Sequence, residues 1–139
     1  MATDLGIALP PSWRRTAAPD RGVLVSARAP NLPVSGFRPE VVLRFGSASL
    51  GDLARELNDF AVEDEDEFDL FGHDVSYQRF AHRVGEVDVV CDQWSWHADA
   101  PTTAPDVTLT CSVARQDYWD YCDVFEAIAE TVDLGPRAA

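Results

Sequence analysis

The sequence predicts an α+β fold, in which one antiparallel sheet of about six strands packs against two helices. Three observations lead to this prediction. Several segments alternate apolar and polar residues with the period of two that is typical of strands. Two other segments repeat apolar residues at spacings of three and four, as amphipathic helices do. The gaps between successive strands are short, which favours antiparallel hairpins over parallel crossovers.

The first half of the chain contains three predicted strands and one predicted helix. A short apolar run at residues 5–9 is interpreted as a brief strand that ends in a Pro-Pro turn. Residues 22–30 and 37–45 alternate as strands, with a turn containing Pro and Gly between them. Leucines and other apolar residues then recur at helical spacing, so we predict a helix over residues 49–61. The acidic run that follows is expected to end this helix as a solvated loop.

The second half contains three further predicted strands and a closing helix. Alternation over residues 75–80 and 87–96, with Gly-Glu between them, predicts two strands joined by a turn. Residues 107–113 show the clearest alternation of a half-buried strand. Apolar residues over 117–132 recur at helical spacing. The predicted order is β-β-β-α-β-β-β-α, within a single domain of residues 1–139.

The charge balance excludes some classes of partner. The chain has 24 Asp plus Glu against 11 Lys plus Arg, all of them Arg, and its formal net charge is −13. A surface this acidic argues against binding nucleic acid or docking on an anionic membrane, because each phosphate contact needs a cation. It favours a cationic partner instead, although a high net charge also serves solubility alone.

Several chemical signatures are missing from the sequence. No apolar segment approaches the ~20 residues of a membrane helix, and no secretory signal is visible, so we expect a cytoplasmic protein without membrane insertion. Cys91, Cys111 and Cys122 have no close pair and are expected to be reduced thiols. The cysteines and histidines lack the tight ligand pairs of zinc sites, so we expect no metal. No glycine-rich phosphate loop is present, and no cofactor is expected.

Some motifs resemble a known fold family. Pro-Pro-Ser-Trp at residues 10–13 closes the opening apolar run, and Phe-Arg-Pro-Glu-Val-Val occupies residues 37–42. Residues 121–129 are similar to the closing helix of the LpqN group. Together with the element order, these motifs resemble the PsbP-like superfamily, which includes actinobacterial LpqN lipoproteins, DcrB and the Eag-type chaperones of secreted effectors. The resemblance implies an α+β fold and a protein-binding or accessory role, and it implies no catalytic residues.

Aromatic residues provide the main candidate for a binding site. Trp94 and Trp96 lie two positions apart on a predicted strand, so both point to one face, which Asp92 shares. Tyr118 and Trp119 lie near the start of the last helix. An aromatic patch flanked by carboxylates would suit an apolar or basic peptide, because Trp and Tyr dominate interface hot spots. Alternatively, the tryptophans pack under a helix as part of the core.

A run of consecutive carboxylates is the second candidate site. It consists of Glu63, Asp64, Glu65, Asp66 and Glu67. The run is either a solvated loop or a docking strip for a basic segment of a partner. It lacks the Asp-x-Asp-x-Asp-Gly order of a calcium-binding EF-hand loop.

The sequence favours a non-catalytic protein-binding module. We expect a cytoplasmic adaptor or chaperone for a secreted or toxic partner, with an immunity protein as a variant of the same class. The partner would be another protein with a basic or apolar segment, and a homodimer is left open. The alternative is a carrier of a small apolar ligand in a pocket between sheet and helix. A closed apolar cavity would favour the carrier, and an open aromatic groove would favour a polypeptide.

An enzyme is the third class considered. No Gly-x-Ser-x-Gly elbow is present, and catalytic residues are not expected. A Cys–His pair, such as Cys111 with His97, would require a proximity that sequence alone does not show. An inward-facing Cys or His beside a polar cleft would favour this class.

Overall fold

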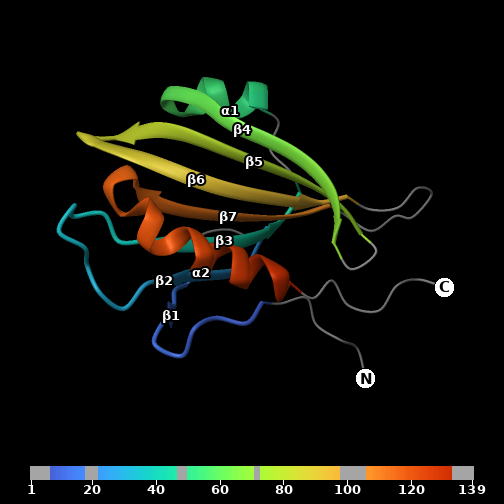
Figure 1. The fold of residues 1–139 in the computed structure, drawn as a ribbon, viewed down its shortest axis with the longest axis horizontal. Coiled ribbons are helices and arrows are strands. Elements are labelled where there is room, and N and C mark those ends of the chain that lie inside the picture. Colours follow the sequence, from blue (N-terminus) through green and yellow to red (C-terminus); the bar gives the residue numbers. More distant parts are fainter. Residues whose placement is uncertain (1–6, 18–21, 47–49, 71–72, 98–105, 133–139) are drawn as a thin grey trace.

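The computed structural model describes residues 7–17, 22–46, 50–70, 73–97 and 106–132 of the chain. Seven strands form one antiparallel sheet in the order β1-β2-β3-β7-β6-β5-β4 (Figure 1). The strands are β1 (Arg14–Arg15), β2 (Val23–Arg28), β3 (Glu40–Phe45), β4 (Asn58–Leu70), β5 (His73–Val84), β6 (Val87–Trp96) and β7 (Val107–Ala114). The helices are α1 (Leu50–Glu56) and α2 (Tyr118–Glu130), and the short 3-10 helix η1 (Arg115–Asp117) leads into α2. The α+β class is confirmed, with seven strands rather than about six.

The sheet packs against helices on both of its faces. On one face α2 crosses the sheet (Figure 1), and Phe125 of α2 and Leu109 of β7 belong to one buried cluster. On the opposite face, Leu53 and Leu57 pack against Phe80 of β5. Both helices therefore bury apolar side chains on the sheet, which is the expected stabilisation of an α+β fold. None of the helices in the described part of the chain is long and apolar enough to cross a membrane.

The hairpin between β5 and β6 turns through Gly85 and Glu86, as predicted. Gly85 has a φ of 61°, a conformation that residues with a Cβ rarely adopt. A positive φ at the first central residue alone is the pattern of a type II′ turn, whose twist matches that of antiparallel strands. The pairing register of this hairpin places Tyr77 of β5 opposite Trp94 of β6.

The predicted helix over residues 49–61 is shorter than expected. Residue 49 lies outside the described residues, and α1 ends at Glu56. The chain then reverses near Asp59, whose φ of 53° lies in the left-handed region. Phe60 would continue the apolar spacing of the predicted helix. Its ring instead packs on the sheet, with its centroid 5.3 Å from that of the Phe80 ring on the neighbouring strand.

The acidic run lies in strand β4, and the prediction of a solvated loop is wrong. This strand pairs with β5 on one side only and forms an edge of the sheet. Bulges between Asn58 and Ala61 and between Val62 and Asp64 interrupt its pairing. An edge strand leaves one row of backbone groups towards solvent, and charged side chains there discourage pairing with another chain. Carboxylates are therefore tolerated at these positions.

The predicted strand at residues 5–9 does not form in its described part, residues 7–9. Ile7 is buried in the main core, and the Ala8 amide donates to Thr131 Oγ1 at 2.9 Å. The apolar run is thus tied to the end of α2 instead of pairing with a strand. The Pro-Pro turn forms as predicted, and the two-residue strand β1 follows it.

Candidate functional site

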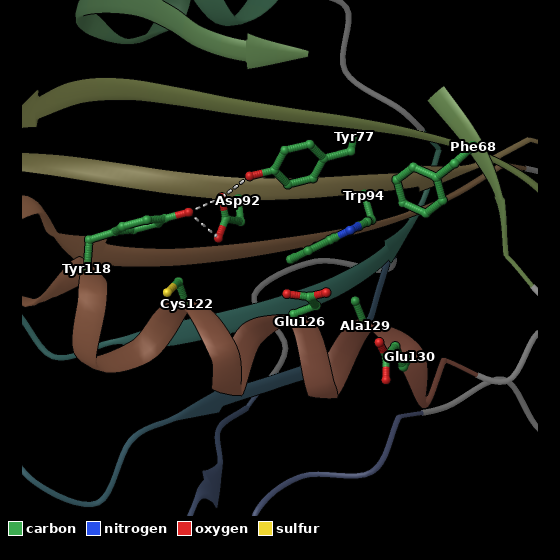
Figure 2. Close-up of a pocket in the computed structure, with 9 residues that line it drawn as sticks. All are labelled: Phe68, Tyr77, Asp92, Trp94, Tyr118, Cys122, Glu126, Ala129 and Glu130. Carbon is green, nitrogen blue, oxygen red and sulfur yellow. Dashed lines mark hydrogen bonds between the residues drawn. The ribbon is translucent and has the colours of Figure 1, made fainter. Parts of the chain in front are cut away.

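A groove of about 330 Å³ lies between α2 and strands β4, β5 and β6 (Figure 2). Aromatic, aliphatic and acidic side chains line it together: Phe68, Tyr77, Asp92, Trp94, Tyr118, Cys122, Glu126, Ala129 and Glu130. Phe68 is 37% exposed, and the Glu126 and Glu130 side chains are also exposed. The hollow is therefore an open groove rather than a closed apolar cavity.

Strand pairing brings the aromatic rings of the groove together. Tyr77 lies opposite Trp94, with ring centroids 5.2 Å apart and an interplanar angle of 48°. Phe68 of β4 pairs with Val75, which lies two residues before Tyr77 and so on the same face of the sheet. The two tilted rings form a corner, and the ring of Phe68, which is more exposed than Trp94, lies beside them (Figure 2).

Helix α2 supplies the opposite wall. Its groove-facing residues recur at spacings of three and four, so they lie on one side of the helix: Tyr118, Cys122, Glu126, Ala129 and Glu130. The adjacent side of α2, which includes Phe125 and Ile128, is buried against the sheet. Packing of this buried side fixes how the acidic residues face the groove.

Asp92 is the buried carboxylate of the groove, with an exposed fraction of 2%. The Tyr77 hydroxyl donates to Oδ1 at 2.5 Å, and the Tyr118 hydroxyl lies 3.0 Å from Oδ1 and 3.1 Å from Oδ2. Burial raises the pKa of Asp92, as does the charge of Glu126, whereas the two hydroxyls and the charge of Arg79 lower it. Burial also raises the pKa of both tyrosines, which keeps them protonated as donors.

A chain of ion pairs flanks the groove. The Arg79 guanidinium carbon lies 5.6 Å from the centroid of the Tyr118 ring, and its Nε lies 3.5 Å from Glu63 Oε1. Arg115 lies between Glu63 and Asp88, with nitrogen–oxygen distances of 2.5 Å and 2.7 Å. Glu63 of the acidic run is therefore already paired within the molecule.

The other four carboxylates of the acidic run divide between the two faces of β4. Asp64 and Asp66 lie on the α2 face, and Glu65 and Glu67 lie on the α1 face. The run therefore presents no single strip of five carboxylates. Docking of a partner on this edge strand stays a prediction.

The structure brings together only some of the predicted aromatic site. Trp94, Asp92 and Tyr118 line the groove. Trp94 and Trp96 are 6% and 3% exposed and both belong to the main core cluster, whereas Trp119 is 81% exposed. Burial thus supports the core alternative for both Trp94 and Trp96, although Trp94 also lines the groove, while Trp119 lies outside it. The binding role of these residues stays a prediction.

Six groove residues are not identified as site residues by the sequence reasoning: Phe68, Tyr77, Cys122, Glu126, Ala129 and Glu130. Glu126 and Glu130 are four residues apart beside the apolar stripe of the last helix, a spacing that places them on one side. That spacing was the available signal, but it does not show which strands the helix faces.

A second pocket, of about 510 Å³, lies on the opposite face between α1 and the sheet. Within it, Cys91 Sγ lies 3.6 Å from His82 Nε2 and 3.3 Å from Ser112 Oγ. This is an inward-facing Cys–His pair beside a polar cleft. Burial raises the pKa of Cys91 to about 12 and lowers the pKa of His82. Both groups therefore favour the neutral form, unlike the thiolate–imidazolium pair of an activated nucleophile.

The other Cys–His combination, Cys111 with His97, shares no contact. Cys111 is fully buried in the main core, and His97 at the end of β6 lies 2.7 Å from Ser76 Oγ through its Nε2. Across the described ranges, no cluster of three or more His, Cys, Asp or Glu is placed to hold a metal ion.

Comparisons with known proteins identify the fold. No protein-family model matches the chain. No curated protein matches it either. The structure of LpqN from Mycobacterium tuberculosis, a protein involved in cell envelope biogenesis, is similar with a TM-score of 0.67 and 14% identity, covering 95% of this chain and 83% of that one.

Two further solved structures are similar. A Pseudomonas aeruginosa protein of unknown function, described as a putative regulator, has a TM-score of 0.66 and 11% identity, covering 99% of this chain and 100% of that one. Cyanobacterial PsbP from Synechocystis has a TM-score of 0.55 and 14% identity, covering 89% of this chain and 82% of that one. The chain therefore has the PsbP-like fold that its motifs implied.

Proposed function

We propose that this protein is a non-catalytic protein-binding module that holds a short segment of a partner polypeptide in the groove beside α2. The observation that carries the proposal is the combination of an aromatic floor at Trp94 with an exposed acidic rim at Glu126 and Glu130. Aromatic side chains bury a large contact area, and they dominate the binding energy of protein interfaces. Because the groove is open, it suits a partner polypeptide that lies across it and inserts one side chain.

The charge of the chain supports a cationic partner. The formal net charge is −13, so the field around the molecule attracts positively charged segments and accelerates their encounter. We propose that the module acts in the cytoplasm as an adaptor or chaperone for a secreted or toxic protein, or as an immunity protein. Similarity to LpqN, a protein involved in cell envelope biogenesis, motivates the choice of a secreted partner.

The absence of catalysis is part of the proposal. The Cys91 thiol lies 3.6 Å from His82 Nε2, and its raised pKa keeps it unreactive at neutral pH. The polar floor around it is bonded internally, since Gln93 Nε2 donates to Thr110 Oγ1 at 2.9 Å and Thr108 Oγ1 donates to the Gly46 carbonyl at 2.6 Å. These contacts support a structural role for the polar side chains of this face.

A carrier of a small ligand is the second candidate. The groove volume of about 330 Å³ falls at the lower end of the ~300–1,000 Å³ that is typical of small-molecule sites. The exposed carboxylates and the partly exposed Phe68 favour a polypeptide over an enclosed apolar ligand.

Site-directed photo-cross-linking in the native host tests the two candidates. A photoreactive phenylalanine analogue replaces Phe68, which lines the groove and is 37% exposed, and in a matched control it replaces Ala127, which is exposed on α2 outside the groove. We expect one polypeptide adduct from position 68 and none from position 127. Equal labelling at both positions would contradict groove binding. A small molecule that co-purifies without any polypeptide adduct would favour the carrier.

A further inference from the structure

We infer that the groove recognises a cationic side chain, a lysine or arginine of the partner polypeptide, through its aromatic ring faces and its carboxylates. This inference rests on the proposed function and specifies the chemistry of the segment that enters the groove. Aromatic rings around an ammonium group, completed by carboxylates, are an established way to bind organic cations. The groove brings both kinds of group to one place (Figure 2).

The rings supply the first part of the recognition. Phe68 is 37% exposed and Tyr77 is half-buried, whereas Trp94 is 6% exposed and lies with its ring centroid 5.2 Å from that of Tyr77. A cation within ~6 Å of a ring centroid is attracted by the negative potential of the ring face. The molecule already uses this interaction next to the groove, where Arg79 lies 5.6 Å from the Tyr118 ring centroid.

The carboxylates supply the second part. Glu126 and Glu130 lie four residues apart on one side of α2, where like charges repel each other. The charge of Glu126 also raises the pKa of the buried Asp92, so the two carboxylates repel each other electrostatically. The ion pairs of Arg28, Arg79, Arg83 and Arg115 go to Glu40, Asp59, Glu63 and Asp88. A cation that enters the groove would relieve this repulsion.

An uncharged occupant fits the groove less well. An apolar side chain would displace water from Glu126 and Glu130 without replacing its hydrogen bonds, and desolvation of an unpaired charge is unfavourable. A lysine or arginine places its aliphatic stem along Phe68 and Ala129 while its charged end reaches the carboxylates. Because Asp92 already accepts bonds from two tyrosine hydroxyls, it contributes through its charge.

Peptide titration with NMR detection tests the inference. Three synthetic Gly/Ser peptides differ only at one central residue, which is lysine, acetyl-lysine or norleucine, and the signal followed is the indole N–H of Trp94 in the full chain. Butylammonium serves as a small cationic probe. We expect the lysine peptide to bind with a Kd about tenfold lower than the two uncharged peptides, which corresponds to about 1.4 kcal/mol.

Two double variants locate the effect. Glu126→Gln with Glu130→Gln is expected to remove the preference for lysine. Asp120→Asn with Asp123→Asn removes the same charge from α2 at exposed positions outside the groove, and it is expected to keep the preference within about twofold. Equal losses in both variants would assign the effect to overall charge and overturn the inference.

The remaining outcomes separate the inference from the proposed function. If the norleucine peptide binds as tightly as the lysine peptide, cation recognition is overturned while polypeptide binding stands. If butylammonium shifts the Trp94 signal and no peptide does so at millimolar concentration, the site serves small amines and the polypeptide partner is overturned. If no probe shifts the signal, both are overturned.

Discussion

Replacement of Trp96 with Ala is expected to destabilise the protein strongly, whereas replacement of Trp119 is not. Trp96 is 3% exposed on β6, between Val75 of β5 and Val107 of β7, which are both buried. Truncation of a buried Trp removes its transfer free energy and leaves a cavity, with a typical cost of ~3–5 kcal/mol. Trp119 is 81% exposed, so Trp119→Ala is expected to change the free energy of unfolding by only about 0.5 kcal/mol.

Thermal and urea unfolding, followed by circular dichroism, measure the difference. For a domain of this length, each kcal/mol shifts Tm by roughly 3–5 °C, so Trp96→Ala should lower Tm on the order of 10–20 °C. The urea midpoint should fall in parallel with an unchanged m-value. A Tm for Trp96→Ala within a few degrees of the unmodified chain, or an equal loss in Trp119→Ala, would refute the burial assigned to these two residues.

Three further predictions concern charge and thiol chemistry. Burial raises the pKa of Asp92 above its usual 3.8, so the contribution of this carboxyl to the free energy of unfolding is present below pH 3.8 and is lost as the pH rises through the folded-state pKa. The Tm of Asp92→Asn should therefore rise relative to that of the unmodified chain as the pH rises. A Tm difference independent of pH would contradict this. N-ethylmaleimide should modify Cys122 before the two buried thiols, as mass spectrometry would show, and prior labelling of Cys91 would be inconsistent with its burial. Glu65→Gln with Glu67→Gln should slow association with a cationic partner and flatten its salt dependence if β4 docks that partner, and unchanged rates in stopped-flow measurements would exclude this role.

The facing of side chains along the strands was predictable from the sequence. Alternation along β6 correctly placed Trp94 on the same face as Asp92, because a strand reverses its side chains at every residue. The break after α1 was not predictable from periodicity, since Phe60 continues the helical spacing of Leu53 and Leu57. Only the left-handed backbone of Asp59 and the contact between Phe60 and the sheet reveal the change to a strand.

The candidate site was predictable only in part, for a related reason. Local patterns identified Trp94 and Tyr118 as candidates, but Phe68 joins them only through the pairing of β4 with β5. The path of α2 across the sheet then decides that Trp96 is buried while Glu126 faces the groove. The position of one element relative to another decides these contacts, and the residue spacing within a single element does not encode that position.

Protection of Cys122 from alkylation by the partner tests the groove most directly. Cys122 lines the groove, whereas Cys91 and Cys111 are buried, so one thiol reports on occupancy. The segment recovered by cross-linking at position 68 would be added at a saturating concentration, with binding verified by calorimetry. A segment held in the groove is expected to slow alkylation of Cys122 in proportion to occupancy. An unchanged alkylation rate with the segment fully bound would place the partner elsewhere and contradict the proposed function.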